Sequence, residues 1–172
     1  MRGSYTLFIL SFIFLAIFSR FIPHPANFTS LNAMALMGTL YFKSCWISFF
    51  VVASSMLLTD AVLGYHPMVS FVYLSFALIA FFGKWLKEKS SFLQAASLTV
   101  FSSLLFFFLT NFGEWLMGSL YPKTAAGFVT CYIAAIPFFA NQLLGDLIYS
   151  SVLFLLFKFL RKRSFSGCVI NL

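Results

Sequence analysis

Charged residues, and acidic residues above all, are what this sequence of 172 residues has least of. Only 9% of the chain is charged, and the acidic residues number four: Asp60, Glu88, Glu114 and Asp146. In soluble domains roughly a quarter of the residues are charged, because the surface must be covered with polar groups. Since 62% of this chain is hydrophobic, we exclude an ordinary soluble domain. The composition predicts an all-α integral membrane protein in a lipid bilayer, with residues 1–172 forming one domain.

The groups that most active sites need are also scarce. The three cysteines, Cys45, Cys131 and Cys168, lack CxxC or metal-ligand spacing, and the two histidines, His24 and His66, have no close partner in the sequence that would complete a metal site. The sequence contains no nucleophile–base pair, Gly-rich phosphate loop or ATP-binding motif. We therefore expect no enzyme activity, no metal site and no cofactor.

The net charge of +7 does not indicate a nucleic-acid partner, because the basic residues lie in the gaps between apolar runs rather than on one arm or face. With six crossings, Arg20 and Lys123 fall on one side of the membrane. The other side holds Arg2, Lys43, Lys84, Lys87, Lys89, Lys158, Arg161, Lys162 and Arg163. Basic residues mark the cytoplasmic side. We therefore expect a multi-pass protein of the bacterial cytoplasmic (inner) membrane with both termini in the cytoplasm.

Prolines, glycines and charged turns divide the chain into about six transmembrane helices. The expected helices cover residues 1–19, 31–42, 45–63, 68–85, 91–116 and 137–160. A signal peptide would also explain the first run, but no small-residue cleavage site follows it.

Two of these segments depart from a regular span. The short second helix extends only ~18 Å, less than the hydrocarbon core. It either crosses together with its flanking turns or packs tightly against neighbours, which its small residues Ala33, Ala35 and Gly38 would let approach. Residues 124–136 are predicted to form a half-helix before the last span, because Pro137 suits the first turn of a new helix.

Polar residues inside the apolar sequence gather toward the expected outer half of the protein. They are Asn27, Asp60, Tyr65, His66, Asn111, Glu114, Trp115, Tyr121, Asn141 and Asp146. Polar groups at membrane depth are costly unless they face a cavity, a partner or a ligand. The asymmetry predicts a small-molecule pocket that opens to the outside and is closed by Phe and Leu below.

In the last expected helix, Gln142, Gly145, Asp146 and Tyr149 follow the spacing i, i+3, i+4 and i+7 and share one face. Asp146 lies roughly 9 Å from the outer end of the helix at the helical rise. A carboxylate at that depth must be paired, hydrogen-bonded or protonated. Two interpretations stay open: contact with a ligand, or a structural hydrogen bond to Ser or Thr on a neighbouring helix.

Glu114 and Trp115 end the fifth expected helix, and Asn111 lies one turn earlier on the face of Glu114. Ligand contact competes here with a simpler interpretation, in which the Trp belongs to an interfacial belt and the Glu is solvated. The complete set of predicted ligand-binding residues is Asn27, Asp60, His66, Asn111, Glu114, Trp115, Asn141, Gln142, Asp146 and Tyr149.

Four segments carry a family resemblance: SRFIPHPANFTSLNAMAL at 19–36, TDAVLGYHP at 59–67, FLTNFGEWL at 108–116 and YPKTAAGFVTCYIAAIPFFANQLLGDLIY at 121–149. In these segments the chain resembles an uncharacterised bacterial family of small integral membrane proteins, over about residues 19–160. That family resembles, in size, number of spans and topology, the substrate-binding S components of energy-coupling factor (ECF) transporters.

The resemblance implies a six-helix protein that captures a vitamin or another small-molecule nutrient at its outer face. It also implies a membrane-embedded ECF coupling subunit and two cytoplasmic ATPases as partners. S components commonly carry an alanine-x-x-x-alanine motif in the first helix, where this chain offers Ala16 alone. The alternative hypothesis is a structural or assembly protein that binds another membrane protein or lipid through its Phe-rich faces.

Overall fold

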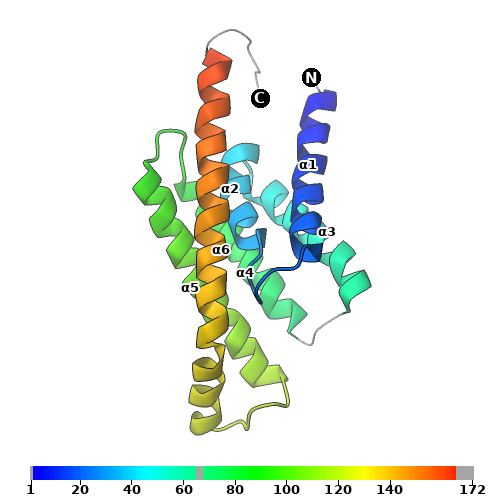
Figure 1. The fold of residues 1–172 in the computed structure, drawn as a ribbon, viewed down its shortest axis with the longest axis vertical. Coiled ribbons are helices and arrows are strands. Elements are labelled where there is room, and N and C mark those ends of the chain that lie inside the picture. The colour runs from blue at the N-terminus through cyan, green and yellow to red at the C-terminus, as the bar shows by residue number, and fades with distance from the viewer. Residues whose placement is uncertain (1, 65–67, 166–172) are drawn as a thin grey trace.

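The computed structural model describes residues 2–64 and 68–165, and every regular element within these ranges is helical (Figure 1). In chain order the elements are α1 (Arg2–Phe21), α2 (Leu31–Phe42), α3 (Cys45–Leu63), α4 (Val69–Phe82), the short 3-10 helix η1 (Gly83–Trp85), α5 (Phe92–Met117) and α6 (Ala125–Phe165). The all-α class is confirmed. The predicted bounds of α2 and α3 agree with the structure to the residue.

Local capping chemistry explains where α3 and α5 begin and end. Ser44 has an extended backbone, and its side chain accepts a hydrogen bond from the backbone N–H of Ile47, which satisfies a free donor of the first turn. Gly64 ends α3 with a φ of 99°, a conformation that favours glycine. At the start of α5, Ser91 and Gln94 form a reciprocal capping box.

The short helix α2 is the centre of the bundle. All of its residues are buried, and it packs against α3, α4, η1, α5 and α6. Close approach depends on small residues, as the sequence predicted. Gly38 lies directly against Ser48 of α3, whose hydroxyl donates to the carbonyl of Ala35 at 2.7 Å. Gly83 lies against the carbonyl oxygen of Leu36 in the same way.

The expected half-helix before the last span is wrong. Apart from Thr124, residues 124–136 and 137–160 belong to a single helix, α6, that continues through Pro137. The proline removes one backbone hydrogen bond, the one to the carbonyl of Ile133. Ending the helix there would leave several N–H and C=O groups unpaired in apolar surroundings, which costs more than one missing bond.

The start of α1 and the end of α6 lie at the same end of the molecule (Figure 1). At this end Glu88 joins three elements. Its carboxylate contacts Arg161 at 2.9 Å and Lys43 at 3.8 Å, and its carbonyl accepts hydrogen bonds from Lys158 and Arg161. We call this end the basic end.

The outer surface of the bundle is apolar. Three helical stretches are long and apolar enough to cross a membrane: Cys45–Leu63, Phe92–Met117 and Ala125–Lys162. Shorter apolar helices cover Ile9–Phe21, Leu31–Phe42 and Val69–Trp85. Large side chains such as Phe14, Phe50 and Phe108 are exposed on these helices. An apolar surface of this extent is stable in contact with lipid and unfavourable in water. It indicates a membrane-associated protein.

Candidate functional site

A cavity of about 530 Å³ opens opposite the basic end, and all six α-helices contribute to its wall. We call this end the cavity end. Its charged and imidazole side chains are Arg20, His24 and Glu114, and its amide side chains are Asn27, Asn32, Asn111 and Gln142. The apolar part of the wall includes Val72, Phe76, Phe106, Phe107, Phe138 and Phe139. A cavity of this size with a few converging polar groups is typical of a small-molecule site.

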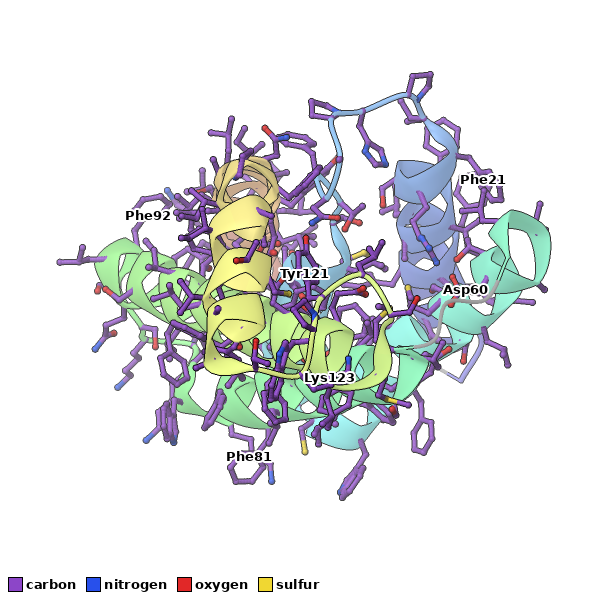
Figure 2. All side chains as sticks on the ribbon, turned by 90° about the horizontal axis from the view of Figure 1, so that it is seen from below. Phe21, Asp60, Phe81, Phe92, Tyr121 and Lys123 are labelled. Carbon is purple, nitrogen blue, oxygen red and sulfur yellow. The ribbon has the colours of Figure 1, made fainter. Side chains whose placement is uncertain are left out.

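Figure 2 looks onto the cavity end. The turn that carries Tyr121 and Lys123 lies in front of the bundle, and Asp60 lies on α3 on the side of α1. Phe81 points away from the bundle. The turn is held to α5 by two side chains. Trp115 Nε1 donates to the carbonyl of Pro122 at 3.1 Å, and Lys123 Nζ donates to the carbonyls of Gly118 and Trp115.

Arg20 and Asp60 form an ion pair beside the cavity. The guanidinium Nη1 lies 2.7 Å from Asp60 Oδ1 and also contacts Thr59 Oγ1. The side chain of Arg20 is 16% exposed and that of Asp60 is 1% exposed. Arg20 lines the cavity and Asp60 lies behind it. The charge of the arginine is therefore compensated by a buried carboxylate rather than by water.

Asp146 lies in a second polar cluster behind the opposite part of the wall. Its Oδ2 accepts hydrogen bonds from Asn32 Nδ2 of α2 at 2.9 Å and from Ser103 Oγ of α5 at 2.7 Å. Gln142, one turn earlier on α6, donates from Nε2 to the carbonyl of Ser103 at 3.0 Å. The structural hydrogen bond to a serine on a neighbouring helix, one of the two interpretations, is thus present.

The predicted ligand-binding residues divide into three groups in the structure. Asn27, Asn111, Glu114 and Gln142 line the cavity. Asp60 and Asp146 lie directly behind it, each bound to a lining residue.

The remaining four lie elsewhere. Trp115 binds the turn at Pro122, Tyr149 packs against Phe28 with ring centroids 5.8 Å apart, and Asn141 is half-buried on α6 beside the lining residue Gln142. His66 falls outside the described residues.

Several polar residues of this wall were not among the predicted ligand-binding residues, and Arg20 and Asn32 matter most. Arg20 was assigned only to the topology signal, although a basic residue at the end of an apolar helix is a natural partner for the nearby intramembrane Asp60. Asn32 lies within the apolar run of α2, and nothing in the sequence linked it to Asp146. Its position as a single amide in an otherwise apolar helix was the signal available.

Among the described residues, no three His, Cys, Asp or Glu side chains cluster as metal ligands would. The wall offers amides, one imidazole, one guanidinium and one carboxylate, which suit recognition of an organic molecule by hydrogen bonds.

Comparison with known proteins gives one family. The chain belongs to a family of unknown function (DUF6580), whose model matches residues 2–168. No curated protein matches the chain. No solved structure matches it.

Proposed function

We propose that this member of the family is the substrate-binding component of an uptake system, which captures a small-molecule nutrient at the outer face of a bacterial cytoplasmic membrane. The observation that carries the proposal is the cavity of about 530 Å³ walled by all six α-helices. Polar groups from helices far apart in sequence converge there, which the packing of an apolar bundle does not require.

The distribution of charge supports the orientation. The contacts of Glu88 with Lys43, Lys158 and Arg161 place basic side chains at the end opposite the cavity. Basic residues face the cytoplasm in multi-pass membrane proteins. In the proposed arrangement the chain crosses the membrane six times, both termini are cytoplasmic, and the cavity opens outward.

The ECF S-component type supplies a mechanism for this arrangement. The sequence has no ATP-binding motif, so the energy for release inward must come from other subunits. A coupling subunit in the membrane with two cytoplasmic ATPases would fill that role. The small residues of α2 are buried in the centre of the bundle, so a coupling subunit cannot contact them. It would dock against the outer surface of another helix.

The test uses two neighbouring alanines of α6. Ala135 lines the cavity, whereas Ala134 is exposed on the outside of the helix. We expect Ala135→Trp to fill the cavity and Ala134→Trp to leave it open. Each protein is purified in detergent, and its small-molecule content is extracted and identified by mass spectrometry.

The proposal predicts a small molecule that co-purifies with the wild type and with Ala134→Trp and is depleted from Ala135→Trp. Thermal unfolding of each variant checks that both proteins fold. A molecule retained equally by all three proteins is bound elsewhere and contradicts the proposal.

A further inference from the structure

The amides of the cavity wall are oriented by their protein partners. Asn32 donates to a carboxylate, Asn111 donates to the carbonyl of Phe107 at 2.7 Å, and Gln142 donates to the carbonyl of Ser103. Carbonyl and ionised carboxylate oxygens only accept hydrogen bonds. One N–H of each amide therefore points to its protein partner, and the amide oxygen keeps its two lone pairs.

Other polar groups of the wall are oriented in the same sense. Thr110 donates its hydroxyl hydrogen to the carbonyl of Phe106 at 2.8 Å. The lone pairs of the hydroxyl oxygen therefore stay free to accept a hydrogen bond. His24 Nδ1 lies 2.8 Å from the carbonyl of Pro25, to which it donates its hydrogen. The wall therefore includes several hydrogen-bond acceptors beside the donors of Arg20.

One of these acceptors has no donor within residues 2–64 and 68–165. Asn32 is 6% exposed, and its Oδ1 is buried with no hydrogen-bond partner among the described residues. Leaving a buried acceptor unsatisfied costs about 1–3 kcal/mol. Because Asn32 also lines the cavity, this buried oxygen lies beneath the wall and not at its surface.

The charges around the cavity favour a cation. Of the four acidic residues, Asp60 and Glu88 form ion pairs, whereas Glu114 and Asp146 form none within the described chain. Glu114 is half-buried and lines the cavity. Lys123, at the same end, directs its Nζ to the carbonyls of Trp115 and Gly118.

The apolar side of the wall suits the same ligand. Phe107 and Phe139 pack with ring centroids 4.8 Å apart, and Phe76 and Phe106 with centroids 5.4 Å apart. Aromatic rings bury the apolar body of a ligand, and their faces attract an organic cation.

We infer that the cavity takes a small organic amine, whose protonated nitrogen donates hydrogen bonds to Asn111, Gln142 and Glu114 of the wall while its apolar body lies against the phenylalanines. The inference rests on the proposed function, because it names the chemical class of that ligand. Arg20 does not reverse this selectivity, since Asp60 neutralises it.

The experiment compares three probes that share an indole ring and differ in the end group: tryptamine, a cation; tryptophol, its neutral alcohol; and indole-3-acetate, an anion. Binding to the full-length protein in detergent is measured by calorimetry. We expect tryptamine to bind at least about tenfold more tightly than the other two, as one charge-assisted hydrogen bond suffices to give.

A matched pair of variants locates the charge. Glu114→Gln removes the carboxylate at the cavity with little change of shape, and Glu88→Gln does the same at the basic end. We expect Glu114→Gln to lower the affinity for tryptamine about tenfold and to leave the affinity for tryptophol unchanged. Glu88→Gln should alter neither affinity.

The outcomes separate this inference from the proposed function. Equal or tighter binding of tryptophol or indole-3-acetate, or a co-purified molecule without a basic nitrogen, overturns the amine inference and leaves small-molecule capture standing. A co-purified molecule with a basic nitrogen supports both. Binding of no probe together with no co-purified molecule overturns both.

Discussion

Asn32 of α2 donates a hydrogen bond from Nδ2 to Oδ2 of Asp146 in α6, at 2.9 Å and across 114 positions of the sequence. Both side chains are almost fully buried, at 6% and 2% exposure. The bond joins the central helix of the bundle to its longest helix, and it fixes one amide of the cavity wall. The carboxylate therefore acts on the site through Asn32, from behind the wall.

The first prediction concerns Asp146. We expect Asp146→Leu to lower the free energy of unfolding by about 2 kcal/mol, because Asn32 Nδ2 and Ser103 Oγ lose their shared acceptor. Asp146→Asn keeps an acceptor oxygen and should be destabilised less. Thermal unfolding in detergent measures both. Equal stability of the Leu variant and the wild type would show that the bonds contribute nothing.

The second prediction concerns the ion pair of Arg20 and Asp60. Asp60→Leu leaves a mostly buried guanidinium without its counter-charge, so we expect the free energy of unfolding to fall by about 3 kcal/mol. The double variant Arg20→Met with Asp60→Leu removes both charges and should be more stable than Asp60→Leu alone. A double-mutant cycle of unfolding measurements gives the coupling. A double variant whose loss is the sum of the two single losses would contradict a coupled pair.

The third prediction concerns the packing of η1 on α2. A Cβ at Gly83 would overlap the carbonyl oxygen of Leu36 and the side chain of Thr39. Gly83→Ala should therefore destabilise the protein by roughly 1–3 kcal/mol, the usual range for overpacking. The neighbouring exposed Lys84→Ala serves as the control and should be neutral. Unchanged unfolding of Gly83→Ala would mean that the two helices have room to move apart.

Much of the fold followed from local signals in the sequence. Prolines, glycines and charged turns marked the gaps between helices, so α3 and α5 were predicted within a residue or two. The structure adds the serine caps at 44 and 91 that begin these helices. The small residues of α2 indicated its close packing. Pro137 misled, because its local preference for a first turn was outweighed by the cost of unpaired backbone groups.

The site was predictable only in part. Intramembrane polarity pointed to Asn111, Glu114 and Gln142, which line the cavity. It could not show that Asp146 lies behind Asn32, because that contact depends on how α2 sits between α5 and α6. When most of the chain is apolar, hydrophobic periodicity does not determine which faces meet.

The fourth prediction concerns orientation. Lys123 lies at the cavity end and Lys87 near the basic end, and both are exposed. In a chain whose three native cysteines are replaced by alanine, we introduce Lys123→Cys or Lys87→Cys separately. A membrane-impermeant maleimide applied to intact bacterial cells should label position 123 and spare position 87 until the cells are opened. The reverse labelling would place the cavity on the cytoplasmic side.

The central claim is that the cavity between the six α-helices captures a small molecule. Native mass spectrometry of the purified wild-type protein tests it most directly, because it records bound molecules and co-purifying subunits in one spectrum. We expect a discrete small-molecule adduct with one ligand per chain. An empty chain that co-purifies with another membrane protein would contradict it and favour a structural or assembly protein.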